Sequence, residues 1–173
     1  MPTGLCFDPS LTKWGWVVFQ DGIEFIDAGC IRTTADSSNG KIEDKVRRVR
    51  HIYRTIRDDI ISEYDPDWVG SEWLWGGQRY NAIWTSGMMG TMVPILFEDK
   101  ELPVEYVAAS KINKPLTGKK SATKEDVQFS VLQEYPSIYE HIPDVKYKRE
   151  AICDAVAVLH FCRMERNSFK VLF

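Results

Sequence analysis

The sequence predicts an α/β fold in which a central, mixed, five-stranded sheet is flanked by helices. Three observations predict it. Short apolar runs open the chain, a long stretch with helical periodicity follows, and strands and helices then alternate in the order βββαβαβαα. At 173 residues, with 44% hydrophobic and 27% charged residues, the chain is long enough to bury a core of its own. We therefore expect a single domain that spans residues 1–173.

Strands are expected where short apolar runs end at turn residues. Five such runs predict strands at residues 3–8, 15–20, 23–32, 68–72 and 103–107. The Asp21-Gly22 pair favours a hairpin turn between the second and third strands. Helices are expected over residues 40–63, 79–93, 124–135 and 149–164.

The helical segments differ in character. In the first, isoleucine and valine recur every three or four residues, which predicts an amphipathic helix with basic residues on its other face. Thr123 is expected to cap the third helix, because Glu125 and Asp126 follow in its first turn. A single helical turn is expected to start at Ser110, and residues 136–148 are expected to form an irregular loop.

Three acidic residues lie in apolar surroundings. Asp8 ends the first strand, Glu72 ends the fourth, and Asp154 lies in the last helix, which is apolar almost all round. Burying an unpaired carboxylate costs several kcal/mol or more, so each acid needs compensation, and a bound cation is the strongest candidate. The three acids together predict one shared metal site. Glu150 lies one turn before Asp154, so it is either a further ligand or an acid favoured by the helix dipole.

The hairpin after Asp8 limits the classes of protein to which the chain can belong. Ser10, Thr12 and Gly15 follow on the returning strand. This pattern occurs in RNase H-like nucleases, where the aspartate holds Mg²⁺, and a similar hairpin cradles phosphate in sugar kinases and actin-like ATPases. The second class needs two related domains, so the length of this chain disfavours it.

Basic residues are concentrated in two segments, although the net charge is −3. Between residues 106 and 124 there is no acid, and the lysines are Lys111, Lys114, Lys119, Lys120 and Lys124. Residues 41–57 contain seven Lys or Arg against Glu43 and Asp44. Local patches matter more than total charge for binding a polyanion, but a solvated helix face would give the same pattern.

The cysteines and the absence of long apolar runs indicate in which cellular compartment the protein is expected. Cys6, Cys30, Cys153 and Cys162 have no CxxC spacing, so we expect reduced core thiols and no zinc site. We expect neither a signal peptide nor a membrane-spanning segment, because no apolar run is long enough to cross a membrane. These features predict a cytoplasmic protein of a bacterium or of a phage-infected host.

Several blocks occur in a specific order and spacing along nearly the whole chain: LCFDP (5–9), GW (15–16), AGCIRT (28–33), PDWVGSE (66–72), LPVEYVAA (102–109), SATKEDVQ (121–128) and DAVAVLH (154–160). Through these blocks the sequence resembles the RuvC family of Holliday-junction resolvases. The resemblance implies an RNase H-like fold, a homodimer and divalent-metal cleavage of four-way DNA junctions.

The resemblance also implies roles for particular residues. It places three catalytic acids at Asp8, Glu72 and Asp154. The family's fourth ligand sits three residues before the last aspartate, where this chain has Ala151, and Glu150 is the obvious substitute. Ser10 stands where the family usually has glycine, and we expect that it can contact a phosphate.

The mechanism expected from this set uses two Mg²⁺ ions, for which Mn²⁺ can substitute. Two ions about 3.5–4 Å apart activate a water and stabilise the leaving oxygen in an in-line attack on a phosphodiester. Lysines of the second basic segment, above all Lys119, Lys120 and Lys124, are expected to grip phosphates. The family has a junction-probing aromatic three residues after the second acid, so Trp75 is expected to stack on DNA and Trp73 to pack in the protein.

Two other functions are compatible with the same residues. One is an RNase H-like nuclease that acts on flaps, replication forks or other branched DNA. The other is a junction-binding protein with impaired catalysis, for which Ala151 is the only support; the three intact acids speak against it.

Overall fold

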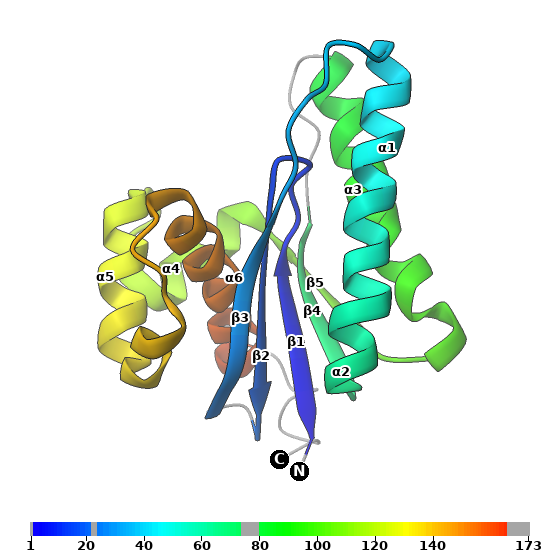
Figure 1. Cartoon of the computed structure of the whole chain (residues 1–173). Coiled ribbons are helices and arrows are strands. Elements are labelled where there is room, and N and C mark those ends of the chain that lie inside the picture. Colours follow the sequence, from blue (N-terminus) through cyan, green and yellow to red (C-terminus); the bar gives the residue numbers. More distant parts are fainter. Residues whose placement is uncertain (1, 22–23, 74–79, 166–173) are drawn as a thin grey trace.

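The computed structural model describes residues 2–21, 24–73 and 80–165, and they form a twisted sheet with helices on both faces (Figure 1). The strands are β1 (Thr3–Asp8), β2 (Lys13–Gln20), β3 (Glu24–Arg32), β4 (Trp68–Trp73) and β5 (Val104–Ala108). Their order across the sheet is β3-β2-β1-β4-β5. The first three strands form an antiparallel meander, and β4 and β5 run parallel to β1. The predicted mixed five-stranded sheet is confirmed.

Helices form a layer on each side of the sheet (Figure 1). One face is covered by α1 (Lys41–Arg54), a π-helix at Thr55–Ile61, α2 (Ser62–Tyr64) and α3 (Tyr80–Phe97). A 3₁₀ turn, Glu98–Lys100, follows α3. The opposite face carries α4 (Ala109–Thr117), α5 (Lys124–Glu134), a 3₁₀ helix at Pro136–His141, and α6 (Lys146–Glu165).

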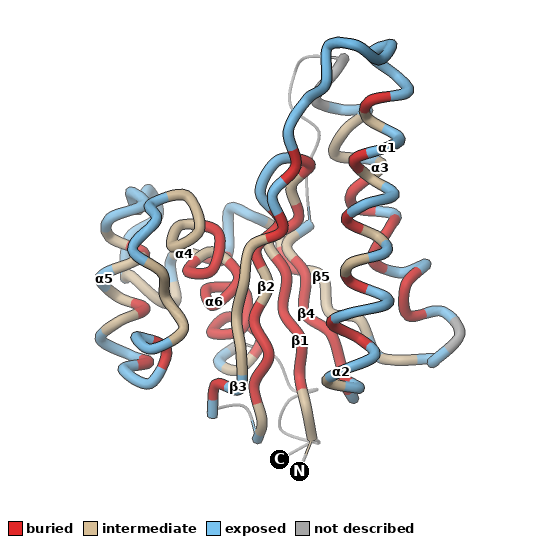
Figure 2. The backbone as a smooth tube through the Cα atoms, in the orientation of Figure 1, coloured by how far each residue is buried: buried red, intermediate tan, exposed pale blue. Residues whose placement is uncertain are grey.

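The two faces of the sheet bury separate cores, because successive side chains of a strand point to opposite sides. In β1, Leu5 and Phe7 join the core under α1 and α3, whereas Cys6 joins the core under α6. Figure 2 shows this burial along the strands and along the inner sides of the helices. Asp8 therefore follows Cys6 onto the α6 side of the sheet, since it is two residues further along the strand.

Three predicted boundaries were wrong. The single turn expected at Ser110 is the nine-residue helix α4, which buries Ile112 and ends at Gly118 with a φ of 72°. The last helix begins at Lys146 and not at 149, and the loop expected over 136–148 contains the 3₁₀ helix. The second helix continues to Phe97 because Leu96 and Phe97 are buried in the core, although Pro94 lies inside it.

The described residues also bear on the cysteines and on membrane spans. All four cysteines are free; Cys6, Cys153 and Cys162 are buried and Cys30 is partly buried. Burial raises the pKa of the Cys162 thiol to about 12, so it is un-ionised at neutral pH. Over the described part of the chain, no helix is both long and apolar enough to span a bilayer.

Candidate metal centre and DNA-binding surface

Two of the three predicted acids lie at one edge of the sheet. Asp8 is the last residue of β1, and Glu72 lies one residue before the end of β4. The two strands are parallel, and Phe7 pairs with Ser71, so the two acids come next in the same register. Their carboxyl groups lie close enough for each to shift the pKa of the other.

The third acid is delivered by α6, which lies directly on β2. Gly15 pairs with Asp8 across the hairpin, and a Cβ built on Gly15 would lie 2.0 Å from the carbonyl oxygen of Ala151. Only glycine allows this approach of helix and strand. Asp154 follows Ala151 by about one turn, and its side chain is 13% exposed while Cys153 and Ala155 are fully buried.

Burial raises the pKa values of all three acids, and neighbouring groups modify them. Burial raises the pKa of Asp8 well above its ordinary value, and the negative charges of Asp154 and Glu72 raise it further. Burial likewise raises the pKa values of Glu72 and Asp154. The raised pKa of Asp8 favours its protonated form, whereas a cation bound beside the acids would favour their ionised forms.

Lys124 is the cation that the structure places among these acids. It is the first residue of α5, and its Nζ donates a hydrogen bond to Oδ2 of Asp154. Burial lowers the pKa of Lys124, but the charge and hydrogen bond of Asp154 and the charges of Asp8 and Glu72 outweigh burial and raise it. The lysine is therefore charged at neutral pH, and its side chain is 56% exposed.

A capping box fixes the start of α5 and thereby the position of Lys124. Asp126 N–H donates to Thr123 Oγ1 at 3.1 Å, and Thr123 N–H donates to Asp126 Oδ2 at 2.9 Å. The predicted cap at Thr123 is confirmed. Lys119 reaches the same aspartate, with 2.6 Å between its Nζ and Oδ1 of Asp126, so two of the predicted lysines lie beside one helix start.

The donor set is that of a hard divalent cation. Three carboxyl groups and Lys124 lie close enough for their charges to interact, and carboxylate oxygen is the ligand that Mg²⁺ and Mn²⁺ prefer. In the described part of the chain, no three Asp, Glu, His or Cys side chains stand in a ready ligand arrangement, and Asp154 is turned to Lys124. Asp8, Glu72 and Asp154 are the residues that would hold the ion.

Glu150 lies on the same helix as Asp154 and acts on it. Its negative charge raises the pKa of Asp154, and its side chain is 22% exposed. Lys146 Nζ lies 3.8 Å from its Oε1, a loose pair one turn earlier. Ala151, at the position of the family's fourth ligand, is 4% exposed and packs against β2.

The other predicted site residues differ in their surroundings. Ser10 is partly buried, and its Oγ lies 3.3 Å from Thr12 Oγ1. Trp73 packs edge-on against Tyr106, with 5.1 Å between ring centroids, and is 39% exposed. Trp75 lies outside the described residues. The side chains of Lys111, Lys114 and Lys120 are exposed.

Arg48 is a residue of the site region that the sequence did not single out. It is 7% exposed; its Nε donates to Thr33 Oγ1 at 2.7 Å, and its guanidinium also donates to Leu11 O at 3.2 Å. Asp44 lies 3.7 Å away, one turn earlier. Arg48 thus ties α1 to the turn that follows Asp8. The sequence signal for its burial is the i, i+4, i+8 spacing of Asp44, Arg48 and Ile52, which places Arg48 on the same helix face as a buried isoleucine.

The sheet order, the helices on both faces and the acids at the carboxyl edge of β1 and β4 define the class as RNase H-like. Solved structures agree with this fold. The Thermus thermophilus RuvC in complex with Holliday junction substrate superposes with a TM-score of 0.71, 18% identity, and coverage of 95% of this chain and 96% of that one. The yeast mitochondrial Holliday junction resolvase Ydc2 gives a TM-score of 0.61 at 10% identity, over 98% and 84% of the two chains.

Sequence comparison identifies the family. The profile of the family described as "Crossover junction endodeoxyribonuclease RuvC" matches residues 5–160. A RuvC of Edwardsiella ictaluri is 27% identical over 96% of this chain and 90% of its own length, and one from a Wolbachia of Brugia malayi is 26% identical over 88% and 90%. The chain belongs to the RuvC family. Membership implies divalent-metal dependence.

Proposed function

We propose that the protein is a divalent-metal-dependent endonuclease that resolves four-way DNA junctions by paired symmetric nicks. The observation that carries the proposal is the convergence of Asp8, Glu72 and Asp154 on the α6 side of the sheet, where the pKa of each is raised and Lys124 lies among them. Membership of the family supplies the substrate. The corresponding role is DNA recombination and repair in the cytoplasm of a bacterium or a phage-infected cell.

Each residue of the centre has a proposed part. Asp8, Glu72 and Asp154 hold two Mg²⁺ ions, or Mn²⁺ in their place, with Glu150 as the further ligand. Ions bound there would polarise the scissile phosphate and supply a hydroxide at neutral pH. Lys124 balances the charge of the acids and approaches the scissile phosphate from α5. Ser10 and Trp75 contact the DNA near the branch point.

The exposed lysines supply the affinity for the DNA backbone. Lys119 and Lys120 precede α5, and Lys111 and Lys114 lie on α4, which also covers the α6 face of the sheet. Contacts to phosphate position DNA without reading its sequence, and they weaken as salt is raised. We therefore assign these lysines to binding the DNA arms of the junction and not to the choice of cleavage sequence.

A homodimer is part of the proposal, and α3 offers the surface. Within the stretch 86–92, Met89 and Met92 are buried in this chain's own core and are not available to a partner. On α3, Ile83 and Ile95 are 51% and 57% exposed, and at exposed Gly87 an added Cβ would meet nothing within 4 Å. The exposed surface of this helix can approach a second copy closely.

The deciding experiment incubates the protein with Mg²⁺ and an end-labelled four-way junction and maps the nicks. We expect nicks at symmetric positions in two strands of like polarity. Asp8→Asn, Glu72→Gln and Asp154→Asn should each abolish cleavage and leave junction affinity largely intact. Asp144→Asn and Glu63→Gln, which change exposed acids elsewhere, are the matched controls.

The same assay separates the proposal from its alternatives. Equal or faster cleavage of three-way junctions and flaps would indicate a general branched-DNA nuclease. Junction binding without any Mg²⁺- or Mn²⁺-dependent nicking would indicate a catalytically impaired binding protein. Loss of binding in parallel with activity in all three acid variants would contradict the assignment of these acids to chemistry.

A further inference from the structure

A groove of about 1470 Å³ opens beside the hairpin that carries Asp8, on the side of the sheet covered by α1 and α3. Four segments line it. They are the turn after β1 (Ser10, Leu11, Thr12), the loop over residues 35–40, the first turns of α1, and the part of α3 that contains Trp84, Thr85 and Met88. The lining begins at Ser10, two residues after Asp8, so the hairpin turn connects the groove with the strand that carries this acid.

The groove is lined by apolar and aromatic surface that faces water. Trp84 is 53% exposed, and across from it Ile42 and Val46 of α1 are 71% and 43% exposed. A tryptophan ring beside branched aliphatic side chains forms a flat contact surface for a planar ligand. Unstacked bases bind to such rings whatever their sequence, because every base has a π-face.

Lysines lie along the same groove, and its acids are already satisfied. Lys41 and Lys45 line the α1 side. Asp36 accepts hydrogen bonds from Ser38 and Asn39, and Asp44 accepts them from Arg47 and from the backbone of residue 36. The two acids are therefore held within their own loop and helix, which leaves the lysine amines for an anionic ligand.

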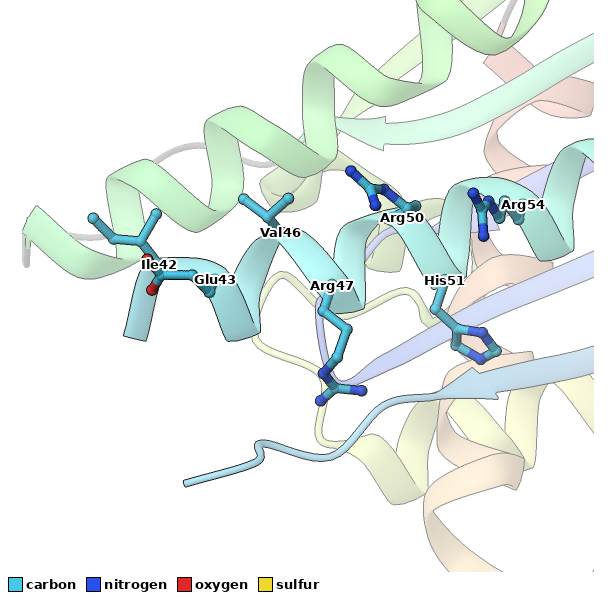
Figure 3. Close-up of a pocket in the computed structure, with 7 residues that line it drawn as sticks. All are labelled: Ile42, Glu43, Val46, Arg47, Arg50, His51 and Arg54. Carbon is cyan, nitrogen blue, oxygen red and sulfur yellow. The ribbon is translucent and has the colours of Figure 1, made fainter. Parts of the chain in front are cut away.

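The basic face of α1 continues the groove. Ile42 and Val46 also line a shallower depression of about 630 Å³ that carries Arg47, Arg50, His51 and Arg54 (Figure 3). Figure 3 shows Arg50 on the same side of the helix as Val46, with Arg47 and His51 on the other. Within the described part of the chain, Arg50 and Arg54 form no ion pair, and they stand about 6 Å apart along the helix axis.

We propose that this groove binds unpaired nucleotides of the DNA strand that leaves the metal centre at the branch point. The bases lie against Trp84, and Lys41 and Lys45 contact the phosphates. The strand then continues to Arg50 on α1. The inference rests on the proposed function, since it takes its strand from the cleaved junction. An intact duplex is disfavoured as the occupant, because its bases are stacked and cannot use the apolar wall.

Affinity for an oligothymidine and for a four-way junction with unpaired thymines at the crossover tests the groove. We expect Trp84→Ala to weaken both affinities by about 5- to 100-fold, as removal of a stacking ring does. Tyr139→Ala, which removes a 72% exposed ring from the 3₁₀ helix before α6, is the matched control and should change neither. Quenching of 2-aminopurine at the unpaired positions should be lost in Trp84→Ala alone.

The lysines are tested through the salt dependence of the same affinities. Lys41→Gln and Lys45→Gln should each reduce the slope of log affinity against log salt by about 0.7 for the single strand. Lys100→Gln removes a charge from the 3₁₀ turn after α3, where the lysine pairs with Asp65, and should leave the slope unchanged. Thermal melting of each variant shows that it is folded.

The outcomes separate this inference from the proposed function. If the wild type resolves junctions and Trp84→Ala binds both DNAs as tightly as the wild type, the groove inference fails and the function stands. Suppose instead that the wild type cleaves no junction but that Trp84→Ala still weakens the affinity for oligothymidine. The groove inference then stands and the proposed function fails. If a substitution in the groove changes the sedimentation of the protein but not its DNA affinity, the groove is a contact between copies. That result would overturn the inference.

Discussion

Asp8 shows how one residue links the stability of this fold to its chemistry. Its carboxyl group lies at the end of a strand whose four central residues are buried, and burial together with two neighbouring acids raises its pKa. A carboxyl group whose pKa is higher in the folded protein than in the unfolded chain holds its proton longer when folded. Its contribution to the free energy of unfolding is therefore present below about pH 4 and is lost as the pH rises toward the folded pKa.

We predict that metal-free protein becomes less stable as the pH rises from about 4 toward neutral, and that Asp8→Asn weakens this trend. At neutral pH in chelator, the variant should melt at the same temperature as the wild type or higher, because one repelling charge is gone. Added Mg²⁺ should stabilise the wild type more than the variant. A clearly lower melting temperature for Asp8→Asn in chelator would mark Asp8 as a structural residue.

Glu150 tests the departure from the family at Ala151. We predict that Glu150→Gln lowers the cleavage rate by at least about 100-fold, because a ligand would be lost from the metal centre. The measurement is the single-turnover rate over a range of Mg²⁺ concentrations, with Glu140→Gln as an exposed control. A rate within a few-fold of the wild type, with unchanged Mg²⁺ dependence, would show that Glu150 is only a helix-end charge.

Among the elements, the contact of β2 with α6 positions the centre. The backbone of α6 approaches β2 so closely at Gly15 that an added Cβ would clash with a carbonyl oxygen. A backbone atom cannot rotate away as a flexible side chain can, so the helix itself must shift. Asp154 would move with the helix, because it lies less than one turn beyond Ala151, whose carbonyl oxygen faces Gly15.

We predict that Gly15→Ala destabilises the fold by about 2–4 kcal/mol and reduces cleavage more than junction binding. Gln133→Ala is the control, since this exposed residue lies inside α5 and away from both β2 and α3. That variant should be neutral or slightly more stable, because alanine has the higher helix propensity. Urea unfolding and a cleavage assay on both variants give the comparison. A Gly15→Ala protein as stable and active as the wild type would show that α6 is loosely seated.

At the scale of the whole molecule, the resolvase assignment requires two cuts. One chain contributes one set of acids, so a twofold dimer is the simplest source of paired nicks in strands of like polarity. We predict a dimer in sedimentation at micromolar concentration and linearisation of a supercoiled cruciform plasmid within one binding event. Ile83→Glu on the exposed surface of α3 should yield monomers that only nick the plasmid. A wild type that is strictly monomeric and only nicks would favour the branched-DNA nuclease.

The sequence predicted the sheet well because each strand ends at a recognisable turn residue. It also brought Asp8, Glu72 and Asp154 together, since charged residues in apolar runs need a common explanation. Local patterns did not predict the length of α4, where Pro115 and Lys114 resemble a loop but Ile112 packs into the core. Nor could they predict that Lys124 reaches Asp154, thirty residues away, or that Arg48 is buried within a basic run.

The π-helix that follows α1 has a geometric consequence. Seven residues, Thr55–Ile61, adopt this wider turn, and Ile56, Ile60 and Ile61 remain buried. Because its hydrogen bonds span five residues, a π-helical segment turns through a smaller angle per residue than an α-helix. The isoleucines of this segment can therefore face the core at an angle that differs from the one a continuous α-helix would give, and the exposed basic residues of α1 keep their own orientation toward solvent.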